Sequence, residues 1–338
     1  MTLLYYIVTA LAIVACTTQG SDQPTVDRIG GVCLVAPPEP LSPDDMVPVR
    51  EIGAGWVAVV PYAFSYGGND PRINYDTSRQ WWGERKEGVI ATIQYAQEAG
   101  LKVMLKPHVW VRGQGWPGDF TLDSEEQWEQ WEQEYANYLR TITQVADSMN
   151  VEMLCIGTEY RHAVTERPEF WEDLIREIRQ NYDGELTYAA NWDNFRKVTF
   201  WDQLDYIGID AYWPLCERQT PTVATLTKGW REPLKQIEAV QRQYQKPILF
   251  TEYGYESRDY MARGHWESSS KEGTVNMEAQ RRAYQVLYDT FWGQPWFAGG
   301  FLWKWFPDHA QAGGEGHTGY TPQNKPAATV IKETYQRL

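Results

Sequence analysis

Short apolar runs alternate with longer amphipathic segments along most of the chain. The apolar runs are mostly continuous, which is typical of parallel strands covered on both faces. They cover residues 31–36, 56–64, 102–110, 152–159, 186–191, 205–213, 247–254 and 297–305. Helical spacing predicts helices over residues 84–100, 124–150, 168–182, 223–245, 275–293 and 326–337, with shorter ones near 41–52 and 195–204. Eight strand–helix units without a break in composition predict an α/β fold, a single-domain (β/α)8 TIM barrel over residues 29–338.

The segment at residues 124–150 carries its own start signal. Ser124 and Gln127 are spaced as a capping box, in which each side chain bonds the backbone N–H of the other residue. Aromatic residues then recur at helical spacing, beginning with Trp128, Trp131 and Tyr135. This stripe is interpreted as core packing rather than as a ligand surface.

The amino-terminal residues form a separate unit. Residues 3–15 are an uncharged apolar run, too short to span a bilayer but suited to an export signal. Cys16 follows a small residue, as in bacterial lipoprotein signals, so residues 1–16 are predicted to be the signal and Cys16 the lipidated residue. Residues 17–28 would be a polar tether, and the mature protein would be periplasmic or anchored in the outer membrane through its lipid alone. The alternative is an apolar helix packed on the domain, because no Lys or Arg precedes Arg28.

Composition narrows the class of ligand. Among the 338 residues, 31 Lys+Arg and 45 Asp+Glu give a net charge of −14, which disfavours nucleic acids and anionic membrane surfaces. The 17 Trp, 21 Tyr and 10 Phe make 14% of the chain aromatic, which excludes a disordered chain. Indole faces suit ligands with an apolar face and hydroxyl edges, so a neutral polysaccharide or oligosaccharide is the expected partner. Cys33, Cys155 and Cys216 lack the spacing of a zinc site or a disulfide framework, and neither a metal nor a cofactor is expected.

The barrel prediction points to candidate site residues, because functional groups in this fold lie at the carboxyl ends of the strands. Glu159 and Glu252 end the fourth and seventh strands, nearly opposite each other around the rim. A carboxyl group there is costly to bury unless it is paired or used in chemistry, so the two are interpreted as a catalytic pair. The other candidates, as substrate-binding residues, are Lys106, His108, Trp110, Asn191, Trp192, Tyr212, Trp213, Trp303 and Trp305.

Five motifs fall on or near these strand ends. They are LKPHVW (105–110), IGTE (156–159), FTEYGY (250–255), FLWKW (301–305) and NKPAA (324–328). Together they resemble glycoside hydrolase family 113, which belongs to the clan A retaining glycosidases and is known for β-1,4-mannanase activity. The resemblance covers roughly residues 29–337. It implies a hydrolase that cleaves β-1,4-linked mannan-type polysaccharide by double displacement, with Glu159 as general acid/base and Glu252 as nucleophile.

The resemblance also assigns roles to two neighbours of this pair. Trp303 matches the clan position of the stacking floor beneath the cleaved sugar. Many clan members carry Asn immediately before the acid/base, where it binds the sugar 2-hydroxyl, whereas this chain has Thr158. Asn191, at the end of the fifth strand, is the candidate to supply the missing amide.

A retaining mechanism sets requirements on the two carboxyl groups. They must lie about 5 Å apart, one protonated to assist the leaving oxygen and one ionised to attack the anomeric carbon. Tyr212 is the first candidate to keep Glu252 ionised by hydrogen bonding, and Lys106 is a weaker one. Glu159 is expected to have a raised pKa.

Several alternatives stay open from the residues alone. Trp110, Trp192, Trp213 and Trp305 could each be barrel packing, and His108 could bind sugar or be a satisfied structural histidine. For function, one alternative is a β-glycosidase of the same clan acting on another neutral β-glycan. The other is a non-catalytic, glycan-binding surface lipoprotein.

Overall fold

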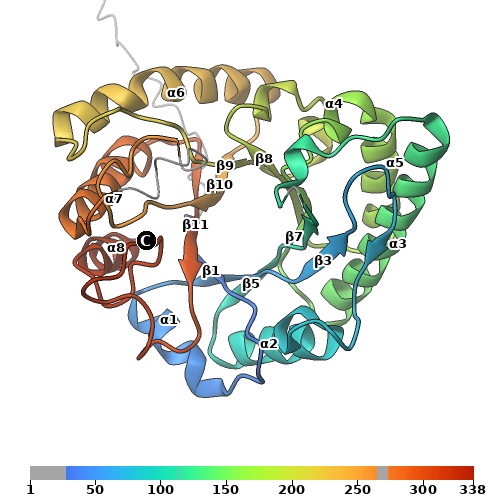
Figure 1. Ribbon diagram of the computed structural model, residues 1–338, viewed down its shortest axis with the longest axis horizontal. Helices are drawn as coiled ribbons and strands as arrows, with labels where there is room; N and C mark the ends of the chain where they lie inside the picture. The colour runs from blue at the N-terminus through green and yellow to red at the C-terminus, as the bar shows by residue number, and fades with distance from the viewer. Residues whose placement is uncertain (1–27, 114, 265–272) are drawn as a thin grey trace, which may run out of the picture.

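A computed structural model describes residues 28–113, 115–264 and 273–338, and Figure 1 shows the chain viewed into a ring of strands. The predicted signal, Cys16 and all of the tether except Arg28 lie outside the described residues. Eight parallel strands close into one barrel, which confirms the predicted (β/α)8 fold. In barrel order they are β1 (Ile29–Leu34), β2 (Trp56–Val59), β5 (Lys102–Leu105), β7 (Met153–Thr158), β8 (Glu185–Asn191), β9 (Ile207–Asp210), β10 (Ile248–Tyr253) and β11 (Phe297–Trp305).

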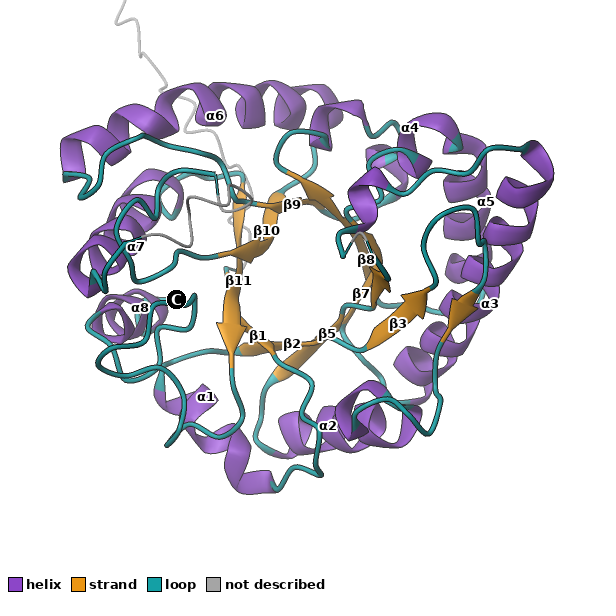
Figure 2. Cartoon of the chain, viewed as in Figure 1, coloured by secondary structure: helices purple, strands orange, loops and turns teal. Residues whose placement is uncertain are grey.

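The α-helices lie outside the strands, as Figure 2 shows. They are α1 (Val47–Glu51), α2 (Lys86–Glu98), α3 (Glu125–Ser148), α4 (Ala163–Glu166), α5 (Pro168–Arg179), α6 (Val223–Tyr244), α7 (Met277–Phe291) and α8 (Ala327–Tyr335). Within the described ranges, none of these helices combines the length and apolar character needed to cross a bilayer.

The predicted helix near residues 195–204 is wrong. Two 3₁₀ turns stand there instead, Phe195–Lys197 and Trp201–Gln203. Val198 between them has an extended backbone (φ −71°, ψ 128°), which no helix can continue through. The aromatic side chains of Phe195 and Trp201 are fully buried, so this connection covers the barrel without a helix.

Three of the predicted strands are too long. Residues 205–213 contain only the four residues of β9, and the other two predicted strands each break at a proline. Residues 56–64 divide at Pro61 into β2 and β3 (Tyr62–Ser65), and residues 102–110 divide at Pro107 into β5 and β6 (His108–Val111). Proline has no N–H to give to a central ladder, so the chain leaves the barrel at both points. β3 and β6 then pair in parallel, with β4 (Ile73–Asn74) antiparallel at the edge of β3. These three strands form a side sheet that carries His108 and Trp110 beyond the barrel rim.

Helix α3 packs against the barrel through the predicted aromatic stripe. Ser124 caps the helix by accepting the N–H of Gln127 at 3.3 Å, and the Gln127 side chain bonds the Ser124 N–H at 3.1 Å, which confirms the capping box. Trp131 is fully buried, with its ring centroid 5.0 Å from that of Tyr135 and 5.1 Å from that of Tyr160. Because Tyr160 directly follows Glu159, this cluster supports the chain that carries a candidate catalytic residue.

We expect Trp131→Ala to lower the free energy of unfolding by about 3–5 kcal/mol, because it leaves a cavity in this aromatic cluster. Urea unfolding monitored by circular dichroism measures the change. Val223→Ala is the control, since this exposed side chain should shift stability by no more than about 0.5 kcal/mol. A loss below about 1 kcal/mol for Trp131→Ala would show that the cluster does not support the fold.

Candidate active site

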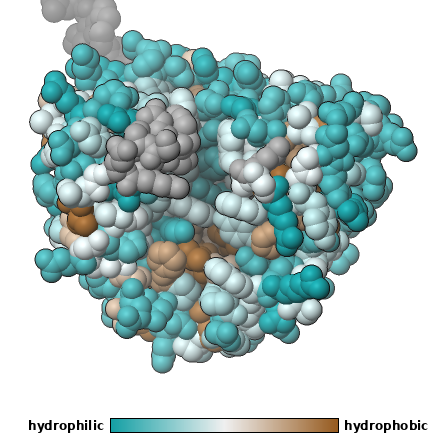
Figure 3. Space-filling view, in the orientation of Figure 1, coloured by the Kyte–Doolittle hydropathy of each residue, from teal (hydrophilic) through white to brown (hydrophobic). Residues whose placement is uncertain are grey.

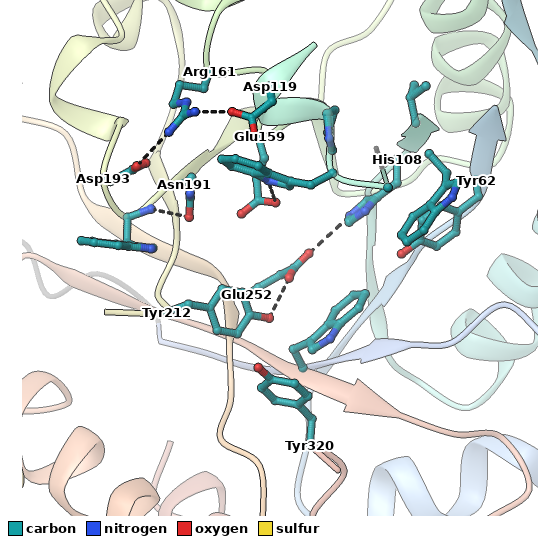
Figure 4. A pocket seen from close by; sticks show the side chains of 17 residues that line it. Tyr62, His108, Asp119, Glu159, Arg161, Asn191, Asp193, Tyr212, Glu252 and Tyr320 are labelled. Carbon is teal, nitrogen blue, oxygen red and sulfur yellow. Dashed lines mark hydrogen bonds and ion pairs between the residues drawn. The ribbon is translucent and has the colours of Figure 1, made fainter. Parts of the chain in front are cut away.

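A cavity of about 700 Å³ opens at the carboxyl end of the barrel, and Figure 3 shows this face of the molecule hollowed near its centre. Glu159 and Glu252 both line it, and their carboxyl groups point into the same space (Figure 4). The other lining residues are Tyr62, His108, Val109, Trp110, Gly115, Trp116, Pro117, Asp119, Arg161, Asn191, Trp192, Asp193, Tyr212, Trp303 and Tyr320. Both carboxyl groups that were predicted from the strand ends therefore lie in one cavity.

Glu252, near the end of β10, is held by two donors. Lys106 Nζ donates to Oε1 at 2.5 Å, and the Tyr212 hydroxyl donates to Oε2 at 2.7 Å. Glu252 is 5% exposed and Lys106 is fully buried, so the pair is shielded from water. Burial alone would raise the pKa of Glu252, but the positive charge of Lys106, with smaller contributions from its neighbours, lowers that pKa to about 2. Glu252 is therefore ionised at neutral pH.

His108 is a neutral neighbour of this pair. Burial first, and then the charge of Lys106, lower the pKa of His108 to about 4. His108 Nε2 lies 2.7 Å from Lys106 Nζ and 3.3 Å from Glu252 Oε1, so the imidazole stands against both members of the pair. The imidazole lies parallel to the Trp303 ring, with centroids 6.0 Å apart and planes within 8°. His108 thus joins the charged pair to the aromatic wall of the cavity.

A third carboxyl group, Asp210, lies beneath the site. It is fully buried, accepts the Thr251 hydroxyl at 2.8 Å and lies 3.9 Å from Lys106 Nζ. Burial and the charge of Glu252 raise the pKa of Asp210 well above its usual range. For Lys106 itself, burial lowers the pKa, but Asp210 and Glu252 together raise it above its ordinary value. Lys106 therefore stays charged, which keeps Glu252 ionised.

Glu159 stands in the opposite electrostatic environment. Burial first, and then the negative charge of Glu252, raise its pKa to about 8, although a hydrogen bond from Trp116 Nε1 at 2.7 Å partly offsets this. Its backbone has φ +56°, an uncommon conformation for a residue with a side chain. The Glu159 N–H bonds the Ala189 carbonyl at 2.8 Å, which holds that turn in place. Glu159 is therefore largely protonated at neutral pH.

Trp116 is itself fixed by a charged cluster. The Arg161 guanidinium lies over its ring, 5.0 Å from the centroid. Arg161 in turn pairs with Asp193 at 3.3 Å and with Asp119, as Figure 4 shows. These contacts tie the loop after β6 to those after β7 and β8, and they aim the indole N–H at Glu159.

Most of the predicted site residues line the cavity: Glu159, Glu252, His108, Trp110, Asn191, Trp192, Tyr212 and Trp303. Three of the predicted substrate contacts lie elsewhere. Lys106 is buried below the cavity, where it bonds Glu252 instead of lining the opening. Trp213 packs among Phe195, Trp230 and Phe250, and Trp305 is 1% exposed and stacks on His309. We correct both tryptophans to packing residues.

Sequence reasoning missed nine of the lining residues, and four of these have large side chains: Tyr62, Trp116, Arg161 and Tyr320. Tyr62 was hidden because Pro61 ends the barrel strand earlier than the apolar run suggests. Arg161 stands two residues after Glu159, a proximity that could have marked it, whereas Trp116 lies in a long loop without periodic signal. Tyr320 lies close to the NKPAA motif, whose buried Lys325 donates to the carbonyl of Gly319 at 2.8 Å and so fixes the loop that carries Tyr320.

Comparison with known proteins gives the family of the chain. The sequence profile of Glycoside Hydrolase Family 113 matches residues 39–325. The chain belongs to glycoside hydrolase family 113. It is therefore a glycoside hydrolase, as the motifs implied. A comparison with curated protein sequences gave no significant match.

Solved structures agree with the family assignment. A family 113 β-1,4-mannanase is 28% identical and superposes with a TM-score of 0.79, over 92% of this chain and 100% of its own. The β-mannanase AaManA from Alicyclobacillus acidocaldarius, in complex with ManMIm, is 25% identical with a TM-score of 0.81, over 92% and 98% of the two chains. A β-glucuronidase of an uncultured Clostridium sp. shares only the fold, at 16% identity and a TM-score of 0.64, over 92% of this chain and 51% of its own.

Because the pKa of Glu159 is raised, ionising this buried carboxyl group above its ordinary pKa destabilises the folded state. Glu159→Gln should remove that loss of stability. Between the ordinary glutamate pKa of about 4.3 and the folded value of about 8, the folded state binds more protons than the unfolded state. Wild-type stability therefore falls as pH rises through that window, whereas a glutamine has no proton to lose. The melting temperature of Glu159→Gln should gain on that of the wild type from pH 4.5 to 8 and then level off.

Val223→Ala, an exposed residue on α6 without an ionisable side chain, is the control and should show no such trend. Differential scanning calorimetry at each pH measures both variants. A difference between Glu159→Gln and the wild type that stays constant with pH would contradict the environment described for Glu159.

Proposed function

We propose that this family 113 hydrolase cleaves β-1,4-linked mannan-type polysaccharide with retention of configuration, with Glu159 as acid/base and Glu252 as nucleophile. One observation carries the proposal: two carboxyl groups line one cavity, where Glu252 is paired with the buried ammonium of Lys106 and Glu159 accepts the indole N–H of Trp116. At neutral pH Glu159 is protonated, with a pKa of about 8, and Glu252 is ionised, with a pKa of about 2. Double displacement needs one carboxyl group in each of these states.

In the first step, an oxygen of Glu252 attacks the anomeric carbon while Glu159 donates its proton to the glycosidic oxygen. The glycosidic C–O bond breaks, the leaving sugar departs as an alcohol, and the remaining sugar is esterified to Glu252. Tyr212 and Lys106 hold the attacking carboxylate in place through both of its oxygens. Lys106 also keeps it ionised despite its burial.

The second step follows from the loss of charge at Glu252. Once Glu252 is an ester, its negative charge no longer raises the pKa of Glu159, which then ionises more readily. Glu159 removes a proton from water, the water attacks the anomeric carbon from the face that the leaving group vacated, and Glu252 is released. Two inversions give net retention.

The walls of the cavity suit a neutral sugar. Trp303 and Tyr320 line the cavity with aromatic rings, which can pack against the apolar face of a sugar. Asn191 accepts the Trp192 backbone N–H through Oδ1 at 3.0 Å, so its amide nitrogen is the donor for a bound sugar. This placement supports Asn191 as the replacement for the amide that Thr158 lacks. The choice of mannan rests on the β-mannanases to which the chain is similar.

The test assigns the two roles separately. Glu159→Gln should lower kcat on mannan by about 10²–10⁴-fold, because it removes the proton donor. It should keep far more activity on an aryl glycoside with a 2,4-dinitrophenolate leaving group, which needs no protonation. Glu252→Gln should lose both activities, because no nucleophile remains. Circular dichroism confirms folding, and proton NMR should show the β-anomer first among wild-type products.

Each alternative has its own outcome. Substantial turnover by Glu252→Gln, or the α-anomer as the first product, would refute retention through Glu252. Faster wild-type cleavage of cellulose or xylan than of mannan, glucomannan or galactomannan would identify a β-glycosidase for another neutral glycan. Binding to mannan without any new reducing ends would indicate a glycan-binding protein instead of an enzyme.

A further inference from the structure

A second groove, also about 700 Å³, lies over the side sheet. Tyr62 and Trp110 line both this groove and the catalytic cavity, so the two spaces are neighbours on the same face of the barrel. The groove continues past them to Trp81, Arg79 and Arg112. A chain-like ligand that leaves the catalytic cavity in this direction has to cross the side sheet.

The outward face of the side sheet begins at the catalytic residues. Side chains alternate along a strand, and β6 is buried at Val109 and Val111, half-buried at His108 and exposed at Trp110. His108 contacts Lys106 in the catalytic site, so Trp110 stands one step further along the same face. Its strand neighbour in register is Phe64 of β3, whose side chain also lines the groove. One continuous face therefore leads from the nucleophile into the groove.

Two tryptophans on this route are unusually open to water. Trp81 is 52% exposed and Trp110 is 49% exposed, and every other tryptophan in the described ranges is buried or half-buried. Exposed large apolar side chains that gather in a groove mark a binding surface. Flat indole faces beside polar groups are suited to sugar rings, which have an apolar face and hydroxyl edges.

The polar groups around the platform are held in position. Gln80 donates to the Tyr62 carbonyl at 2.6 Å, and the Trp81 N–H donates to Glu84 at 3.2 Å, which fixes the loop that presents the indole. Arg112 lies against the Tyr66 ring, 5.5 Å from its centroid. Arg112 and Arg79 both line the groove, and their guanidinium groups can donate hydrogen bonds to sugar hydroxyl groups.

We propose that this groove, with Trp81 and Trp110 as its platform, binds distal sugars of the same polysaccharide whose bond is cleaved between Glu159 and Glu252. The inference rests on the proposed function. It extends that function, because a platform away from the cleaved bond binds long chains more tightly than short ones and favours cleavage at internal bonds. Because Tyr62 and Trp110 line both the groove and the catalytic cavity, we favour the substrate chain over an unrelated protein as the ligand of the groove.

The kinetic test compares chain lengths. Trp81→Ala should lower the ratio of kcat/KM on polymeric mannan to kcat/KM on the shortest cleaved mannooligosaccharide by about tenfold, roughly 1.4 kcal/mol of binding free energy. Trp81→Phe keeps an aromatic face and should restore most of the ratio. Arg79→Ala tests the hydroxyl contacts independently and should lower the ratio in the same direction. Val223→Ala, an exposed residue on α6, should leave it unchanged.

A binding test separates this proposal from the catalytic one. In native gels that contain mannan, Glu252→Gln protein should be retarded, and adding Trp81→Ala should reduce the retardation. Unchanged ratios and unchanged retardation in Trp81→Ala would overturn the proposal even if Glu159 and Glu252 act as described. Retardation lost with Trp81→Ala would support the groove even if the catalytic roles failed. A shift in oligomeric state with Trp81→Ala, seen by sedimentation without change in retardation, would assign the groove to a protein contact and overturn the proposal.

Discussion

The buried ion pair between Lys106 and Glu252 is the constraint on which the site depends. A carboxyl group enclosed in a barrel would take up a proton if it stood alone, because burial disfavours the charged form. Lys106 prevents this, because its ammonium group lies against the Glu252 carboxylate. Removing one partner of such a pair typically costs about 3–5 kcal/mol, so the barrel interior and the catalytic geometry are linked. The closed fold shields the pair from water, and the pair keeps Glu252 in the ionised form that the proposed reaction requires.

The second carboxyl group follows from the first. Glu159 shares the cavity with the negative charge of Glu252, and among the described residues its carboxyl group bonds an indole N–H and no cation, so its neutral form is favoured. It also sits on a backbone with φ +56°, which costs free energy in a residue other than glycine. Strain and an unfavourable electrostatic environment thus fall on the same residue. Such costs are characteristic of catalytic positions, where stability is given up for a pKa near the working pH.

The sequence predicted the features that depend on periodicity, and it missed those that depend on tertiary packing. Continuous apolar runs identified the strands, and the strand-end rule brought Glu159 and Glu252 to one cavity. Pro61 and Pro107 shortened two strands, yet the same breaks formed the side sheet that carries Trp110. Tryptophans at strand ends look alike in sequence, so the sequence could not distinguish Trp213 from Trp110. In the structure Trp213 is buried, whereas Trp110 is exposed in the groove. The loop that brings Trp116 to Glu159 has no local signal, because charged residues from three loops fix it.

Lys106 keeps Glu252 ionised, while Glu159 keeps its proton in the same cavity. Carbon-13 NMR of glutamate side-chain carboxyl groups tests this difference most directly. Glu252→Gln and Glu159→Gln variants assign the two resonances. Glu252 should stay ionised down to about pH 3, and Glu159 should titrate near pH 8. In Glu252→Gln, the pKa of Glu159 should fall, because the neighbouring negative charge is gone. If instead both carboxyls of the wild type titrate near pH 4.3, the ordinary value for glutamate, the account is contradicted.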